Sequence, residues 1–406
     1  MLFKRFRLFT LLTLVTALAL LALLALRRGD HQRPKVQAPR PPPPLPREKA
    51  VARSCGEVHE LEQFLNCAAQ HSWRGTSSAD VDELMRLAAE RIGAPTSFVD
   101  SYGLVLEPER NWCHRKARYL RQAAQQKNTN QTTGQAFFQE NWEPNFSCAL
   151  EERLGRYGDG GKWVCDVHSL HLRPQLFRSL GHSQYRCVVY SFGSNNDFSF
   201  EERLHERLPH CQIFVFDATS SPPDPPRDYI QYYSRMLRAA ESSDSLGDIV
   251  TDLNHWEQPV NLEVLKVDIE HGEYDALLGA FDIAKLIRTG HKKLSELNDE
   301  ESRALLTWRA LRRARQVLIE LHFLENATES GHAFFEGMDE AGFVIFHKEP
   351  NIQYTGGTFV EYAFLRLEDS FFRDEHGRHL GETIRHGGSA SLPHPCKAQE
   401  GRRPAG

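Results

Sequence analysis

The sequence has no excess of positive charge, because 54 aspartate and glutamate residues outnumber 49 lysine and arginine residues. The formal net charge of −5 gives no broad basic field, so we expect no nucleic-acid partner. No two of the eight cysteines have the spacing of a metal site, which argues against bound zinc. No internal repeat is visible. At 406 residues the chain can hold one large domain with accessory segments, or two domains.

Long apolar runs are scarce, and the main one is Leu8–Leu26, which contains no charged residue. As a helix it would span about 28 Å, close to the thickness of a bilayer core. Arg27 and Arg28 follow it and make a poor cleavage site for a signal peptide. We therefore favour an uncleaved signal anchor that contacts the membrane through residues 8–26, and keep a cleaved signal peptide as the alternative.

Glycosylation sequons and cysteines bear on the compartment. Sequons begin at Asn130, Asn145 and Asn326, and an even number of cysteines permits disulfides in an oxidising compartment. Cys187 and Cys211 fall in neighbouring predicted strands, where buried thiols are a simple interpretation. We expect the secretory pathway: a single-pass Golgi or endoplasmic reticulum protein with a luminal domain, or a secreted protein if the first segment is cleaved.

Composition divides the chain into five segments. We assign a signal anchor or signal peptide to residues 1–27, a proline-rich stem to 28–52, a helical and loop lead-in region to 53–159, the main domain to 160–370, and a polar tail to 371–406. In the main domain strands alternate with helices, which predicts an α/β fold with a mainly parallel sheet and covering helices. Residues 284–314 are expected to form one long helical crossover, and residues 342–347 and 358–367 two late strands.

The segment Leu262–Ala280 reads as a buried strand that ends in Asp268 and Glu270, followed by a helix. Parallel strands deliver side chains to their carboxyl ends, where open α/β sheets bind ligands. The simpler alternative is that both acids only solvate a strand end. Upstream, a strand ends at Gly193 before a second helix, although the three glycines of a dinucleotide fingerprint are missing. A third strand ends in Asp217, about 20 residues later, which is the spacing of an acid that binds ribose.

These segments resemble the class I S-adenosylmethionine-dependent methyltransferases, and within them the methyltransferase-like protein 24 group, related to the FkbM type of sugar-modifying enzyme. The matching segments are VVYSFGSNNDFSFE (188–201), IFVFDAT (213–219), LKVDIEHGEYDALLGAF (265–281) and QVLIELHF (316–323). The resemblance covers roughly residues 160–368. It implies S-adenosyl-L-methionine as cofactor, with its methionine end over the Gly193 turn and its ribose on Asp217, and an antiparallel strand pair at one sheet edge. Phe192 departs from the family's Gly-x-Gly turn and is expected to obstruct the cofactor if it points into the site.

Eight residues form the expected site. The cofactor-binding candidates are Ser191, Gly193, Asn195, Asp217 and Asp268. The candidates on the acceptor side are Glu270, Glu320 and His322, because a hydroxyl acceptor needs a base near its oxygen. A hydrogen-bonded structural histidine is an equally good interpretation of His322. Asp268 with Glu270 could also hold a divalent cation, but we assign no metal.

The leading hypothesis is O-methylation of a hydroxyl on a glycan or small molecule. The first alternative is a metal-dependent luminal glycosyltransferase, since a membrane anchor, a stem and the Asp268/Glu270 pair fit that outline. The second is a binding domain that kept the methyltransferase fold and lost its catalysis.

Overall fold

A computed structural model describes residues 109–123, 126–127, 134–148, 150–168, 170–171, 173–174, 185–256, 260–322, 328–352, 359–367 and 369–372. The chain divides into two units, 1–49 and 50–406, and every described residue belongs to the second. The expected membrane segment, the stem and the expected tail beyond residue 372 lie outside the described residues. Among the described helices, none combines the length and the apolar character needed to cross a bilayer.

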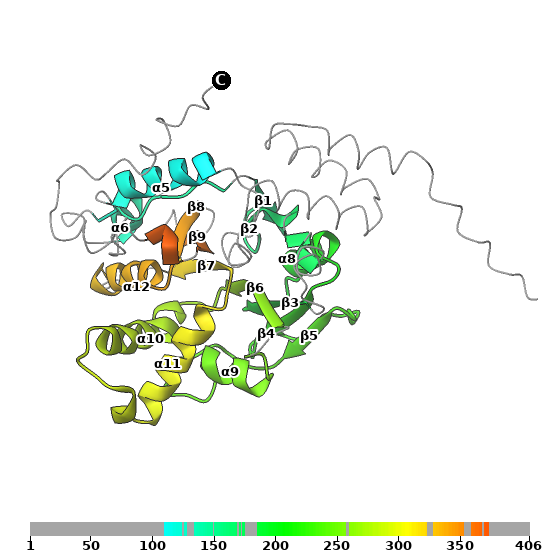
Figure 1. The fold of residues 1–406 in the computed structure, drawn as a ribbon. Coiled ribbons are helices and arrows are strands. Elements are labelled where there is room, and N and C mark those ends of the chain that lie inside the picture. The colour runs from blue at the N-terminus through cyan, green and yellow to red at the C-terminus, as the bar shows by residue number, and fades with distance from the viewer. Residues whose placement is uncertain are drawn as a thin grey trace, which may run out of the picture. The chain divides into compact units, whose positions relative to one another are not determined.

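The described residues contain a seven-stranded sheet with the order β5-β4-β3-β6-β7-β9-β8 (Figure 1). Its strands are β3 (Arg186–Phe192), β4 (Gln212–Phe216), β5 (Ile230–Tyr233), β6 (Val260–Val267), β7 (Gln316–His322), β8 (Phe343–Asn351) and β9 (Phe359–Arg366). Strands β3 to β7 pair in parallel, whereas β9 runs antiparallel between β7 and β8. The predicted mainly parallel α/β sheet and its late antiparallel strands are confirmed.

The chain proceeds from β3 outward through β4 and β5, then returns to place β6 on the other side of β3. This reversal makes the β3–β6 boundary a topological switch point. In open α/β sheets such a point leaves a crevice outside the carboxyl ends of the strands, where ligands bind. The strand order therefore directs attention to the residues that follow β3 and β6.

Apolar side chains of β3 alternate between the two faces of the sheet. Val188 and Tyr190 pack in one core with helices α9 (Leu246–Asp252), α10 (Glu273–Arg288), α11 (Asp299–Leu311) and α12 (Thr328–Glu340). Val189 packs in the other core with α5 (Glu109–Ala123), α8 (Ser199–Arg207), and the antiparallel pair β1 (Glu151–Leu154) and β2 (Lys162–Cys165). Figure 1 shows α9, α10 and α11 gathered at one face. The domain is three layers with the sheet in the middle.

Smaller elements complete the described fold. They are α6 (Gly134–Glu140), which adds Phe137 and Phe138 to the first core, and two short 3-10 helices, η2 (Leu294–Glu296) and η3 (Asp369–Phe372).

The expected helical crossover over residues 284–314 is not one continuous helix: it comprises the end of α10, η2 and α11. After α10, Gly290 adopts φ +74°, a left-handed conformation that ends a helix. Helix α11 then starts at a capping box, in which the Asn298 side chain accepts from the Glu301 N–H and Glu301 accepts in return. The sequence reading also missed β5 and α9, which lie between β4 and β6.

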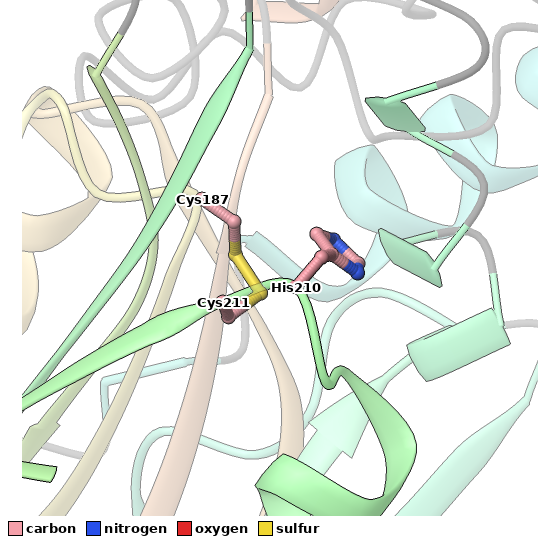
Figure 2. Close-up of side chains that lie close together, drawn as sticks. All are labelled: Cys187, His210 and Cys211. Atoms are coloured by element: carbon pink, nitrogen blue, oxygen red, sulfur yellow. A yellow bond between two sulfur atoms is a disulfide. The ribbon is translucent and has the colours of Figure 1, made fainter. Parts of the chain in front are cut away.

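Two disulfides connect the described cysteines: Cys148–Cys165 and Cys187–Cys211. The interpretation of Cys187 and Cys211 as buried thiols is therefore wrong. They lie next to each other at the start of β3 and before β4, so their sulfurs come within bonding distance. His210 lies close to this pair, but its ring turns away from the sulfur–sulfur bond (Figure 2). Because both sulfurs are bonded to each other, this cluster is not a metal site.

The sequon at Asn145 is buried. This side chain is 6% exposed, and its Oδ1 accepts a hydrogen bond of 2.9 Å from the Ile345 N–H. An attached glycan would have to leave this packed position, so the folded chain disfavours glycosylation there. Asn130 and Asn326 lie outside the described residues.

Removing the strand-to-strand disulfide should lower stability. The bond closes a loop of sequence separation 24, and loops of this size stabilise by about 3 kcal/mol through the unfolded state. We expect the Cys187→Ala/Cys211→Ala double variant to lose about that much free energy of unfolding in urea titrations. A double variant as stable as the parent would contradict the disulfide, as would alkylation of either sulfur in denatured, unreduced protein.

Candidate active site

A cleft of about 390 Å³ lies at the switch point. Its walls come from three places: the ends of β3 and β4, the end of β6 with Glu320 of β7, and the loop between β1 and β2. The lining residues are Arg156, Tyr157, Asp159, Gly160, Gly193, Ser194, Asn195, Asp197, Phe216, Asp217, Thr219, Met236, Lys266, Asp268, Ile269, Glu270 and Glu320. Gly193, Asn195, Asp217, Asp268, Glu270 and Glu320, which were chosen from the sequence, are thus brought together.

The turn after β3 requires glycine. Gly193 has φ +77°, and a Cβ at this position would lie 1.7 Å from the carbonyl oxygen of Asp268. The Gly193 N–H donates to the Phe216 carbonyl at 3.0 Å, and the buried Lys266 ammonium donates to the Gly193 carbonyl. The turn after β3 is therefore held against the ends of β4 and β6, and only glycine fits at position 193.

Two expectations about β3 are corrected. Phe192 does not obstruct the cleft, because its ring is fully buried and stacks on Phe216 with ring centres 4.6 Å apart. Ser191 does not line the cleft either: it is fully buried, and its hydroxyl donates to Glu201 of α8. Consecutive strand residues face opposite sides of a sheet, so neither side chain points out of the strand end.

Asp217 joins two loops. Its Oδ2 accepts from the Ser194 N–H, the Ser194 hydroxyl and the Asn195 N–H at 2.8–3.0 Å. Its Oδ1 accepts from Thr219 and Ser220 over the same range of distances. Burial alone would raise the pKa of Asp217, but these hydrogen bonds outweigh it and hold the pKa below its usual value. The carboxylate is ionised and fixes both loops that flank the cleft.

The sequence reading missed Lys162, the first residue of β2. This side chain is 1% exposed, and its ammonium donates to Asp268 at 2.9 Å and to Glu361 of β9. Glu320 Oε2 lies 4.0 Å away. A buried ammonium thus gathers carboxylates from three neighbouring strands. No local signal marks Lys162, because its partners lie more than 100 residues away.

The pKa values in this cluster diverge. Burial would lower the pKa of Lys162, but the carboxylates raise it, so the ammonium stays charged. Burial raises the pKa of Asp268, yet Lys162 and Lys266 prevail and bring it to about 2. Burial raises the pKa of Glu361 to about 8, helped by Glu320 and Asp268 and opposed by Lys162. The pKa of Glu320 is also raised, chiefly by burial. Asp268 is therefore ionised at neutral pH, whereas Glu361 is protonated.

His322 lies behind the cleft wall and is absent from the lining. It is 1% exposed, its Nδ1 lies 3.0 Å from the fully buried Glu273, and its Nε2 lies 3.4 Å from Glu270. Burial lowers the pKa of His322, but the hydrogen bond from its ring to Glu273 raises it above the usual value. Glu273 also accepts from the Ile269 N–H at 3.1 Å. Glu270 is held with φ +54°, and its side chain is 76% exposed.

The β1–β2 hairpin forms the rim of the cleft, another part that the sequence reading missed. Trp163 anchors it to β8 by stacking on His347 and by donating to Glu349 at 2.8 Å. Arg156 in the hairpin loop contacts Asp197 at 3.2 Å. The glycines at 158, 160 and 161 were the only sequence signal, and they mark a turn rather than a site.

Glu361 gives the folded chain a distinct pH dependence. The unfolded chain ionises this carboxyl near 4.5 and the folded chain near 8, so between these values the folded state binds the extra proton. Its contribution to stability therefore falls as the pH rises through this window, by up to about 1.4 kcal/mol per pH unit. Glu361→Gln removes the titration, so the parent should lose stability relative to the variant in urea titrations from pH 5 to pH 8. Parallel pH profiles of parent and variant would contradict this, and Glu300→Gln, on the exposed surface of α11, is the control.

Comparisons with known proteins bear on this site. No curated protein matches the chain. Among solved structures, one similar chain is described as "Putative hemolysin" from Streptococcus thermophilus, with 9% identity and a TM-score of 0.25, over 53% of this chain and 71% of that chain. A family model described as a methyltransferase domain matches residues 97–289 and 297–366. These residues include every strand of the seven-stranded sheet and all the residues that line the cleft. The chain therefore belongs to this family of methyltransferase domains.

Proposed function

We propose that this chain is an S-adenosylmethionine-dependent methyltransferase that modifies a hydroxyl group on a glycan or small molecule in the secretory pathway. The main support is the position of the cleft, at the β3–β6 switch point of a methyltransferase domain. The resemblance to the methyltransferase-like protein 24 group and to FkbM enzymes supports the glycan or small-molecule acceptor.

The cleft has the groups that the cofactor needs. Its volume of about 390 Å³ falls within the roughly 300–1,000 Å³ of small-molecule sites. Lys266 and Arg156 supply positive charge for a carboxylate, and the ionised Asp268 can accept from an ammonium group. Phe216 and Met236 add apolar surface for a flat ring. The cofactor would supply a methyl group on a positively charged sulfur, and the surplus of acids in the lining suits that charge.

Asp217 is our proposed ribose ligand, and its present contacts set a condition on that role. A ribose diol would donate to the same two oxygens that now accept from Ser194, Asn195, Thr219 and Ser220. Binding would therefore exchange some of these contacts, chiefly those from the hydroxyls of Ser194 and Thr219.

Glu320 is our first candidate for the base. It lines the cleft, its Oε1 accepts from Asn351 at 3.0 Å, and burial raises its pKa towards the working range of a base. The base would take the proton of the acceptor hydroxyl while the chain holds the oxygen in line with the methyl group. Glu270 lines the same wall, whereas His322 is buried and does not line the cleft.

Tyr157 supports an acceptor with an apolar or sugar face. It lines the cleft from the hairpin loop, yet 96% of its surface is exposed. Large apolar side chains held in water beside a cleft are suited to cover a ligand.

The two disulfides support an oxidising compartment, since such bonds persist in secreted and luminal proteins. For the glycosyltransferase alternative, the Asp268/Glu270 pair is the relevant observation. The match to a methyltransferase domain, rather than the charge of this pair, favours methyl transfer over that alternative. The other alternative, an inactive binding domain, would have the same fold and cleft but would not transfer a methyl group.

Ligand binding tests the cofactor assignment. S-adenosylhomocysteine should bind in calorimetry and raise the melting temperature by mass action, while UDP-sugars should do neither beyond the effect of Mn²⁺ alone. Asp217→Ala should weaken binding tenfold or more, because each hydrogen bond to an ionised acceptor contributes about 1.5–3 kcal/mol. If Asp217 binds ribose directly, the losses from the mutation and from a 2′-deoxy analogue should not add. Binding of UDP-sugars alone would contradict the proposal.

Turnover tests the base. Glu320→Gln keeps the shape of the side chain and its contact with Asn351, so S-adenosylhomocysteine should bind as before. The rate of methyl transfer in a single turnover should fall by about 10²–10⁴, as expected when a general base is removed. Glu300→Gln is the control for loss of one carboxylate. A variant that loses cofactor affinity but keeps its rate would place Glu320 in the binding site and the base elsewhere.

A further inference from the structure

One group of side chains beside the cleft has the composition of a metal site. Ligand atoms of Asp268, Glu270 and His322 lie within 4.8 Å of one another. They come from the end of β6, the loop after it and the end of β7, so the parallel sheet itself brings them together. The set of one imidazole and two carboxylates matches the donors that bind divalent transition metals.

The orientation of His322 is the observation that points to a ligand. Its Nδ1 is fixed by Glu273, which is itself fully buried and also accepts from the Ile269 N–H. This leaves Nε2 directed at Glu270, at 3.4 Å. A carboxylate that anchors one ring nitrogen while the other faces the ligand group is the usual second shell of a metal-binding histidine.

The spacing also fits. Two ligands about 2.1 Å from a metal lie about 3.0 Å apart at an octahedral right angle and about 3.4 Å apart at a tetrahedral angle, and the Glu270–His322 separation of 3.4 Å falls in this range. Asp268 uses Oδ2 to accept from Lys162 and has a second oxygen.

We propose that Asp268, Glu270 and His322 bind a divalent transition metal such as Mn²⁺ at the wall of the cleft. Asp268 and Glu270 both line the cleft, so the remaining coordination positions face it and can take an oxygen of the acceptor. A metal-bound hydroxyl loses its proton more readily, and Glu320 lies on the same wall to receive it. The metal site stands independently of methyl transfer, and only this catalytic role rests on the proposed function.

The neighbouring cluster of Asp268, Glu320 and Glu361 is a different case, although its ligand atoms also lie within 4.8 Å. The Lys162 ammonium already lies among these three carboxylates and donates to two of them. A second cation at that point would meet the lysine charge directly. The proposed metal lies instead on the Glu270 and His322 side of Asp268.

Calorimetry of the metal-stripped full chain with Mn²⁺ alone tests the site, without cofactor or acceptor. We expect one bound ion per chain, with weaker binding of Ca²⁺ because imidazole does not suit it. His322→Asn and the exposed Glu270→Gln should each weaken Mn²⁺ at least tenfold and abolish its effect on the melting temperature. His271→Asn is the matched control, since this neighbouring histidine lies outside the ligand set and asparagine tolerates its φ of +75°.

Two results would overturn the proposal. One is a parent chain that binds neither Mn²⁺ nor Zn²⁺. The other is Mn²⁺ affinity that survives Glu270→Gln but is lost in Glu320→Gln, which would place the ion in the Lys162 cluster. Failure of S-adenosylhomocysteine to bind would leave this test unaffected, so the two proposals fail separately.

Discussion

The buried ammonium of Lys162 is the interaction on which the site depends. It joins the β1–β2 hairpin to the carboxylates of β6, β7 and β9, through Asp268, Glu320 and Glu361. Taking these charges out of water costs several kcal/mol per ion, so the cluster is weak evidence for stability. Its effect is on arrangement: without the ammonium, Asp268 would lose its ion-pair partner and the hairpin would lose its polar anchor. The rim of the cleft and the acids on its floor are thus parts of one electrostatic unit.

The sheet was readable from the sequence because its strands follow a local rule. Apolar runs that stop at Gly193, Asp217 and Asp268 indicate the carboxyl ends of parallel strands. The strand order brings those ends together. The face of each side chain was harder to predict. Ser191 and Phe192 directly precede Gly193, yet their side chains lie on opposite faces of the sheet. Phe192 packs in the first core, and Ser191 bonds to Glu201 of α8.

Lys162 and the hairpin could not be found in this way. Lys162 has an ordinary local sequence, and its partners follow it by 106 and 199 residues. Strand β5 and helix α9 were hidden for another reason. Residues 221–227, before β5, are rich in proline and have neither a helix nor a strand pattern, although Tyr232 and Tyr233 belong to a half-buried strand. The Cys187–Cys211 bond needed the parallel pairing of β3 with β4, which sets the two residues side by side.

Asp268 belongs to both the proposed cofactor site and the proposed metal site. It lies between Lys162 on one side and Glu270 with His322 on the other. Lys162 holds its Oδ2 and keeps the carboxylate ionised, with a pKa of about 2. One oxygen of Asp268 lies within 4.8 Å of ligand atoms of Glu270 and His322. On the buried side of the cluster the Lys162 ammonium already neutralises the carboxylate, and an ion from solvent would have to displace it. The outer side, where Glu270 is exposed, stays accessible to an ion or an acceptor.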